Sequence, residues 1–209
     1  METEIVFRIV LPLLILSFAL HRGYYVRQHG EEQNTLKQRE EGLASRIAGL
    51  LGVIGFAAIL IYAIHPLWLS WSSLPLPLWL RWLGVGLALL GFALLQCTQN
   101  TLGKNWSDTP RMIKEQSLIT SGPYRFIRHP IYTAFLLILG STLLISANWL
   151  IGIAWMGMTI LEVTSRIGFE ENLMLEYFGE QYREYMKQTG RLFPRLTAVT
   201  TSAVRNQGD

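Results

Sequence analysis

Residues 130–167 read PIYTAFLLILGSTLLISANWLIGIAWMGMTILEVTSRI, two apolar segments that only Ala147 and Asn148 separate. The first segment covers 130–146, and the second runs from about Trp149 to about Ile167. Each approaches the roughly 20 residues that a helix needs to cross a hydrocarbon core about 30 Å thick. Because the connection is so short, we predict that the two segments form an antiparallel helical hairpin.

Three further apolar runs precede this hairpin, from about Ile5 to Leu20, from about Leu43 to Ile64 and from about Leu78 to Cys97. Half of the 209 residues are hydrophobic, 16% are charged, and the mean hydropathy is positive. The runs are too long and too many to form one buried core, and the composition is typical of a membrane protein. We therefore predict an all-α fold, a polytopic membrane helix bundle with five transmembrane helices.

The basic residues are distributed unevenly between the two sides of this predicted bundle. Of the eighteen Lys and Arg residues, only Arg8 and Arg81 fall on one side. Because cytoplasmic loops retain positive charge, five spans place the N-terminus outside and the C-terminus in the cytoplasm. The net charge of +3 arises from these loops and indicates contact with anionic membrane lipids, not with nucleic acid. The sequence leaves the oligomeric state open.

We divide the chain into three parts. Residues 1–101 carry the first three spans, 102–196 carry a loop, the hairpin and a cytoplasmic C-terminal amphipathic helix, and 197–209 form a tail that we predict to be disordered. The amphipathic helix is expected to continue from the fifth span through Tyr185 and to end near Gly190. It is either a lid that folds back over a bound nucleotide or a helix that lies on the membrane surface.

Residues 122–132, GPYRFIRHPIY, place two arginines, a histidine and two tyrosines at the start of the fourth span. Pro130 is favoured in the first turn of a helix, so His129 is expected close to the N-cap. The free amides and the helix dipole at this point favour an anion. A chain that merely crosses lipid does not need this cluster.

The fifth span carries charged residues on one face. Glu162, Arg166 and Glu170 are spaced by four residues, and Glu171 stands beside them. They are either a stripe of salt bridges, worth about 0.2 to 0.5 kcal/mol per pair in water, or part of a site. Ionisable residues within a membrane are candidates for function, and two groups of them converge at one depth here. We therefore favour a functional site for the whole cluster.

Single members of the cluster also have structural explanations. Arg128 is suited to bind a lipid phosphate, and His129 is suited to cap its helix. Tyr124 and Tyr132 are suited to pack or to anchor the chain at the membrane interface. The lone Cys97 has no companion for a disulfide or a metal site, so we expect no metal.

At these residues the chain resembles the isoprenylcysteine carboxyl methyltransferase family, within a wider group that includes membrane phospholipid methyltransferases. The resemblance covers residues from about 102 to 196. Its motifs are Leu118 to Arg125, Arg128 to Tyr132, Arg166 with Glu170 and Glu171, and Phe178-Gly179 followed by Tyr182 and Tyr185.

The resemblance implies that S-adenosylmethionine binds at the cytoplasmic edge. The residues that it implies for cofactor binding are Ile119, Gly122, Pro123, Tyr124, Arg128, His129, Tyr132, Glu170 and Glu171. It implies that Arg166 lies nearer the acceptor and orients it. A thiol or amine acceptor would have to lose a proton, and Glu170, Glu171 or Tyr132 is suited to receive it; we expect catalytic roles for Arg166, Glu170 and Tyr132. The implied partner is a lipophilic small molecule or a prenylated acceptor.

Ala134 stands where many members of the family have glycine, and the N-terminal third of the chain carries none of the motifs. The acceptor therefore stays open among a prenylated protein cysteine, a small lipid, a phospholipid amine and a small thiol. Two other readings are an NADPH-dependent sterol-type reductase and a non-catalytic membrane protein such as a transporter subunit.

Overall fold

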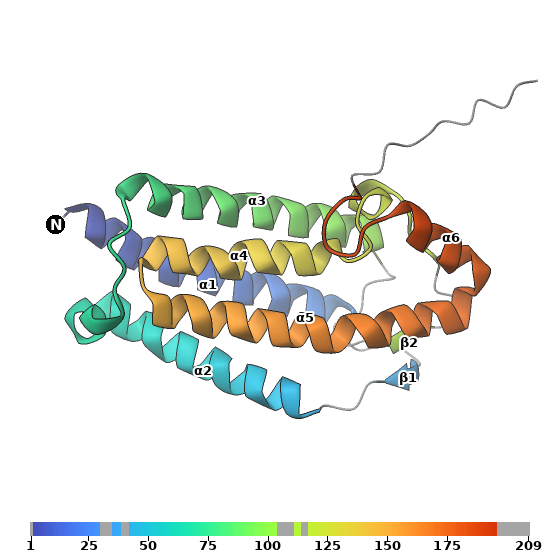
Figure 1. Ribbon diagram of the computed structural model, residues 1–209, viewed down its shortest axis with the longest axis horizontal. Coiled ribbons are helices and arrows are strands. Elements are labelled where there is room, and N and C mark those ends of the chain that lie inside the picture. The colour runs from blue at the N-terminus through green and yellow to red at the C-terminus, as the bar shows by residue number, and fades with distance from the viewer. Residues whose placement is uncertain (1, 30–34, 39–41, 104–110, 114–116, 196–209) are drawn as a thin grey trace, which may run out of the picture.

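The structure is a computed structural model that describes residues 2–29, 35–38, 42–103, 111–113 and 117–195 (Figure 1). Its elements, in chain order, are α1 (Glu2–His29), β1 (Thr35–Gln38), α2 (Leu43–Ile64), η1 (Pro66–Ser72), α3 (Leu78–Leu102), β2 (Arg111–Ile113), η3 (Gly122–Arg125), α4 (Pro130–Ser146), α5 (Trp149–Phe178) and α6 (Glu180–Gln188).

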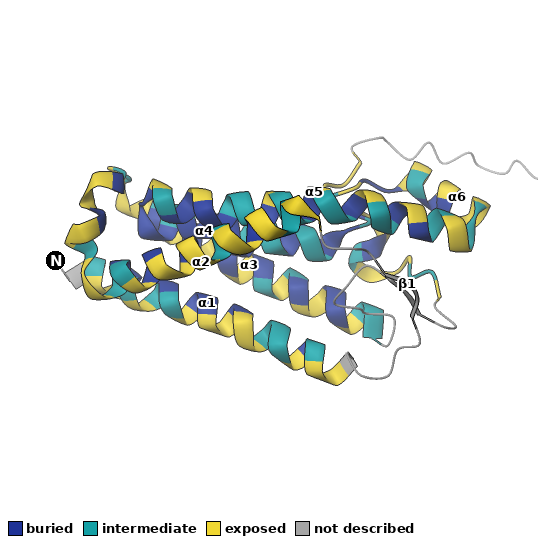
Figure 2. Ribbon diagram, turned by 90° about the horizontal axis from the view of Figure 1, so that it is seen from below, coloured by how far each residue is buried: buried dark blue, intermediate teal, exposed yellow. Residues whose placement is uncertain are grey.

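The five long helices lie side by side and alternate in direction (Figure 1). Helix α4 packs between α3 and α5, while α2 covers the other side of α5. Four of these helices, α1, α2, α3 and α5, are long and apolar enough to cross a membrane, and α4 is a shorter apolar helix of 17 residues. Their outer faces expose apolar side chains such as Leu13 and Phe56. Figure 2 shows that exposed residues run along α1 and α2. This surface suits lipid and not water.

The turn between α4 and α5 confirms the predicted hairpin, and Asn148 explains why the chain turns there. Its side-chain oxygen accepts hydrogen bonds from the amides of Leu150 and Ile151, so it caps the start of α5. Its amide nitrogen donates to the carbonyl of Leu69 and the hydroxyl of Ser72 in η1. The buried Asn148 therefore joins the hairpin to the α2–α3 connection.

Small residues let α3 and α4 approach closely. A Cβ atom at Gly91 would lie 2.7 Å from Ile138 Cγ1, and one at Gly84 would lie 2.8 Å from Leu144 Cβ. Ala88, between these two glycines on the same face, is 1% exposed. This spacing of small residues is the usual way in which membrane helices pack without a hydrophobic driving force.

The two arginines outside the basic loops tie helices together at the end of the bundle where the chain begins. Arg81 forms an ion pair with Glu4 of α1 at 2.5 Å, donates to the hydroxyl of Tyr62 in α2 at 2.7 Å, and donates to the carbonyl of Ile145 in α4. Arg8 donates to the carbonyl of Ala63 at the end of α2. Both cations are thus satisfied within the fold.

Three features differ from the prediction or lie outside it. Strands β1 and β2 form a small antiparallel pair, which was not predicted because the chain shows no alternation of apolar residues there. The helix expected to run on to Tyr185 is broken at Gly179, whose φ of 55° ends α5 and starts α6. The tail predicted to be disordered, 197–209, lies outside the described residues.

Candidate functional site

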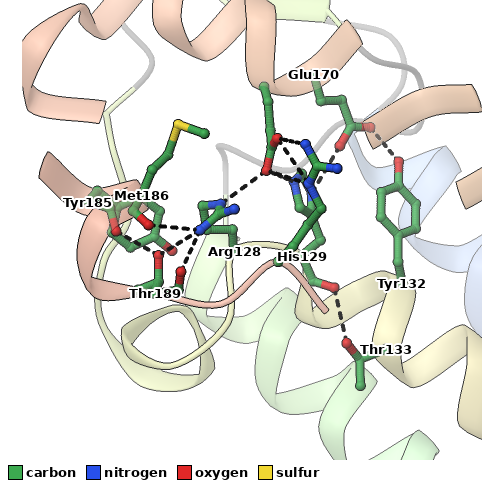
Figure 3. A network of polar contacts seen from close by, with 10 residues as sticks. Arg128, His129, Tyr132, Thr133, Glu170, Tyr185, Met186 and Thr189 are labelled. Carbon is green, nitrogen blue, oxygen red and sulfur yellow. Dashed lines mark hydrogen bonds and ion pairs between the residues drawn. The ribbon is translucent and has the colours of Figure 1, made fainter. Parts of the chain in front are cut away.

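The beginning of α4 and the last turns of α5 bring His129 between two carboxylates. Its Nε2 lies 3.3 Å from Glu171 Oε1, and its Nδ1 lies 3.3 Å from Glu170 Oε2. One turn further along α4, Tyr132 donates a hydrogen bond to Glu170, and its ring stacks on the imidazole at 5.7 Å between centroids. The side chains of His129, Tyr132 and Glu170 point toward one another in Figure 3.

Arg128 extends this cluster toward the C-terminal segment. Its Nε donates to Glu171 Oε1 at 3.0 Å, while its Nη1 donates to the carbonyls of Met186 and Thr189 (Figure 3). Both Arg128 and Glu171 are nearly inaccessible, with side chains 8% and 4% exposed. A buried carboxylate of this kind needs such partners.

Residues 189–192, which we call the C-terminal strap, complete the cluster. The strap pairs with the residues before α4, since the amides of Arg128 and His129 donate to the carbonyls of Gly190 and Arg191 at 2.9 and 3.1 Å. Arg191 donates to both oxygens of Glu171 through its Nε, at 3.2 and 3.1 Å. Glu171 therefore has three cationic or ionisable partners.

Arg191 was not identified from the sequence. It lies beyond the last predicted helix, in a short polar segment without an apolar pattern. The one signal that indicates its position is Gly190, because a Cβ atom there would lie 1.7 Å from the carbonyl oxygen of Phe193. Only glycine permits this tight course of the strap.

The loop before α4 is attached to the same segment through two tyrosines. Gly122, with a φ of 57°, opens the turn η3, in which Pro123 follows and Tyr124 is buried. The hydroxyl of Tyr185 in α6 donates to the carbonyl of Tyr124 at 2.7 Å. Burial raises the pKa of Tyr185 to about 12 although Arg128 acts in the opposite direction, so the phenol stays protonated and donates.

Electrostatics at His129 favour its protonated form. Burial lowers its pKa, but hydrogen bonds to Glu170 and Glu171 outweigh burial and leave the pKa above its usual value. With His129 protonated, the cluster holds three positive groups, including Arg128 and Arg191, around two carboxylates. Such a site offers both anionic and cationic groups to a zwitterionic ligand.

A cavity of about 280 Å³ adjoins the cluster, inside the bundle between α1, α2, α4 and α5. Tyr132 and Arg166 line its polar end, where Arg166 is paired with Glu162 at 2.6 Å. Apolar side chains, among them Leu139 and Val163, line its remaining wall. The cavity thus adds space for an apolar ligand beside the charged cluster.

The sequence from residue 83 to 176 matches the model of the isoprenylcysteine carboxyl methyltransferase family. The fold is also similar to that of a solved eukaryotic intramembrane Ras methyltransferase of this family, with a TM-score of 0.53 and 26% identity. Over these residues the chain is similar to the isoprenylcysteine carboxyl methyltransferase family. Its charged cluster lies mostly within the matched region, whereas Arg191, α1 and α2 lie outside it.

Several curated methyltransferases are also similar to the chain. Protein-S-isoprenylcysteine O-methyltransferase B of Arabidopsis thaliana is 24% identical over 87% of this chain and 91% of its own length. The Dictyostelium discoideum protein-S-isoprenylcysteine O-methyltransferase is 27% identical over 68% of this chain. Methanethiol S-methyltransferase 1 of Bradyrhizobium diazoefficiens is 31% identical over 52% of this chain.

The chain is shorter than several of these proteins. It covers 61% of the Dictyostelium enzyme, 34% of the Bradyrhizobium enzyme and 54% of the solved structure. The solved structure in turn covers 75% of this chain. The region that matches the family model, residues 83–176, contains most of α3, all of α4 and most of α5, but neither α1 nor α2.

Most of the residues predicted for the site lie together. Arg128, His129, Tyr132, Glu170 and Glu171 form one network. Gly122, Pro123 and Tyr124 lie in η3, which α6 contacts, and Ile119 is half-buried just before that turn. Arg166 lies beside the network, at the cavity.

Neighbouring polar residues are paired among themselves. Gln96 and Asn100 of α3 hydrogen-bond to each other and to Tyr25 of α1. On α5, Glu162 pairs with Arg166, while Glu170 bonds to His129 and Tyr132 on α4. In the described part of the chain, no group of three or more His, Cys, Asp or Glu side chains is placed to hold a metal ion.

Proposed function

We propose that this chain is an integral membrane S-adenosylmethionine-dependent methyltransferase that acts on a lipophilic acceptor, most like protein-S-isoprenylcysteine carboxyl O-methyltransferase. The observation that carries the proposal is the contact of His129 with Glu170 and Glu171 beside a cavity that Arg166 lines. The residues suit the methyl donor, whose amino acid part carries a carboxylate and an ammonium group. Arg128 and His129 suit the carboxylate, and the two glutamates suit the ammonium and the ribose hydroxyls.

S-adenosylmethionine supplies a methyl group on a positively charged sulfur. Transfer to a carboxylate removes one positive and one negative charge, so a site that excludes water favours the reaction. Arg166 is placed at the cavity to hold an acceptor carboxylate, and its contribution is positioning. No general base is required for this acceptor.

A thiol acceptor is the second candidate, which the similarity to methanethiol S-methyltransferase 1 favours. A thiol must lose its proton, and the hydrogen-bonded pair of Tyr132 and Glu170 is placed to receive it. The two acceptors therefore differ in the need for a base at Glu170.

The finer topology follows from the charges and the helix directions. Helix α4 is about 25 Å long at 1.5 Å per residue, and it runs antiparallel to α3 and α5, which are both long enough to span. We infer that α4 also spans the membrane, as the fourth of five spans along the chain, and that the site faces the cytoplasm, where the basic residues gather. The N-terminus then lies outside and the C-terminus inside.

We further infer that α6 and the C-terminal strap act as a lid over the bound donor. Arg128 and Glu171, both buried, hold this segment against the start of α4 through Thr189 and Arg191. Truncation after Gly179 should abolish S-adenosylmethionine binding. An unchanged affinity of the truncated protein would reject the lid.

The activity is tested by following the transfer of labelled methyl groups from S-adenosylmethionine in detergent-solubilised membranes. The acceptors compared are N-acetyl-S-farnesylcysteine, methanethiol and phosphatidylethanolamine. We expect transfer to the farnesylcysteine, and Glu170→Gln should reduce it less than it reduces any transfer to the thiol. The absence of transfer to all three acceptors would contradict the proposed function.

A further inference from the structure

Two aromatic side chains are exposed on the segments that enclose the charged cluster. Phe126, in the loop before α4, is 57% exposed, and Phe193, directly after the C-terminal strap, is 72% exposed. The two segments lie side by side at the ends of α3 and α4, since the amide of Gly190 donates to the carbonyl of Phe126 at 3.1 Å (Figure 1). The tight turn at Gly190 brings the backbone of Phe193 next to this pairing. We call Arg125, Phe126 and Phe193 the edge patch.

The edge patch lies close to the first turn of α4. Phe126 shortly precedes Pro130, the first residue of the helix. The hydroxyl of Thr133 in the same turn donates to the carbonyl of Leu192 at 2.6 Å, which holds the residue before Phe193 there. In the proposed topology this turn lies at the cytoplasmic surface of the membrane. Aromatic side chains are enriched at that level of membrane proteins, because their rings suit the boundary between headgroups and acyl chains.

The charges around the edge patch suit an anionic surface. The two segments, 117–129 and 189–195, contain four arginines and no aspartate or glutamate. Two of the four pair with Glu171 in the cluster. Arg125 is exposed, and its guanidinium carbon lies 5.9 Å from the centroid of the Phe126 ring. An arginine beside an exposed aromatic ring complements a leaflet that contains anionic lipids.

Helix α6 is oriented differently and does not offer such a surface. Its two tyrosines, Tyr182 and Tyr185, are buried in the protein. Its exposed side chains form ion pairs, among them that of Arg183 with Glu180. Exposed ion pairs favour water over lipid. A contact between the membrane and the C-terminal segment therefore falls to the residues after α6 and not to α6 itself.

We propose that the edge patch binds the cytoplasmic leaflet, with Phe126 and Phe193 inserted below the headgroups and Arg125 in contact with anionic lipids. The strap that precedes Phe193 also carries Arg191, which bonds to Glu171. Binding of the patch to the leaflet thus holds the strap against the charged cluster, and the affinity for the methyl donor depends on the charge of the lipids. This dependence rests on the proposed function, whereas the position of the patch in the leaflet does not.

Spin labels test that position in the full chain, reconstituted in nanodiscs that contain phosphatidylcholine and phosphatidylglycerol. The label is attached to Phe126→Cys, Phe193→Cys or Gln188→Cys in a Cys97→Ser background, because Cys97 is the single cysteine of the chain. Gln188, exposed at the end of α6, is the control. Collisions of the label with oxygen, which concentrates in lipid, are compared with collisions with a water-soluble nickel chelate.

We expect the labels at positions 126 and 193 to collide mainly with oxygen, and the label at 188 to collide mainly with the nickel chelate. Equal access of the nickel chelate to all three labels would show that the edge patch faces water, as a surface for another protein would, and would overturn the proposal.

The dependence on lipid charge is tested by the affinity for S-adenosylmethionine in nanodiscs with and without phosphatidylglycerol. Wild type should bind about fivefold more tightly in the anionic nanodiscs, which is the effect of one arginine near an anionic surface. Arg125→Gln should lose this difference, and Arg183→Gln, an exposed arginine on α6, should retain it. Equal affinity of wild type in both lipids would overturn the coupling. Wild type that binds the donor in neither lipid would instead contradict the proposed function, and the spin labels would still decide where the patch lies.

Discussion

His129 and Glu171 are 42 positions apart in the sequence, yet His129 Nε2 lies 3.3 Å from Glu171 Oε1. His129 directly precedes α4 and Glu171 lies in the last turns of α5, so their contact depends on how these two helices are positioned relative to each other. The cap at Asn148 and the close packing of α4 on α3 fix that hairpin. The site is therefore a consequence of helix packing elsewhere in the bundle, and this dependence is testable.

Asn148→Ala should lower the free energy of unfolding by about 1 to 2 kcal/mol, because it removes the cap of α5 and the hydrogen bond that Asn148 donates to the buried hydroxyl of Ser72 in η1. Ser73→Ala is the control, since Ser73 is exposed and makes only a local bond to Ser70. Thermal unfolding in detergent measures both. Equal effects of the two substitutions would contradict the role of Asn148.

Gly91→Ala should lower the free energy of unfolding by about 1 to 3 kcal/mol, since the new methyl group would force α3 away from Ile138 and the backbone of Ala134. Gly86→Ala, on the same helix with nothing within 4 Å of the new Cβ, should be neutral or stabilising by up to about 1 kcal/mol. The unfolding transition in detergent reports the difference. Stabilisation at both positions would refute the close packing of α3 on α4.

The pKa of His129 predicts how stability depends on pH. Because the folded-state pKa is raised above about 6.5, the folded protein binds more protons than the unfolded chain. The contribution of His129 is fully present below pH 6.5 and is lost as the pH rises through the folded-state pKa. The slope is at most about 1.4 kcal/mol per pH unit in this window.

Thermal unfolding between pH 6 and pH 9 measures this slope. His129→Gln should flatten the decline, whereas His65→Gln, at the far end of the bundle beside Trp68, should retain it. An identical decline in His129→Gln would show that other groups cause it.

Arg191→Gln should affect the lid more than the fold. Its side chain is 55% exposed and Glu171 keeps Arg128 and His129 as partners, so the loss of stability should stay below about 1 kcal/mol. The release of S-adenosylmethionine should nevertheless become several-fold faster, which stopped-flow displacement measures. Arg195→Gln, which lies beyond the strap, serves as the control. Equal release rates in both variants would contradict the lid.

Hydropathy predicted the positions of the long helices better than the residues at which they end. Helices α2 and α4 begin and end at the predicted residues, because charged or turn-forming residues flank them. Helices α1 and α5 continue to His29 and Phe178, since a helix needs no apolar residues once it leaves the bilayer. Gly179 breaks the predicted C-terminal helix. The sequence conceals this break, because aromatic residues continue at helical spacing on both sides of Gly179.

The charged cluster could be predicted because ionisable residues at the edge of an apolar membrane helix cost free energy, so their presence there indicates a functional role. Which side chains pair with one another inside the cluster could not be predicted. Whether Glu170 bonds to Arg166 on its own helix or to His129 and Tyr132 on α4 depends on the rotation of α5, which periodicity does not determine. Arg191 was missed for a related reason, because it reaches the site from a segment beyond the last predicted helix.

We propose that His129 and Glu171 bind the methyl donor, and calorimetric titration of S-adenosylmethionine into the detergent-purified protein measures this binding directly. His129→Ala is compared with His65→Ala, and Glu171→Gln is compared with Glu180→Gln, whose exposed side chain pairs only locally with Arg183. We predict that wild type and both controls bind with similar affinity and that each site variant binds at least about tenfold more weakly. Unchanged affinity in both site variants, or the absence of binding to wild type, would contradict the claim.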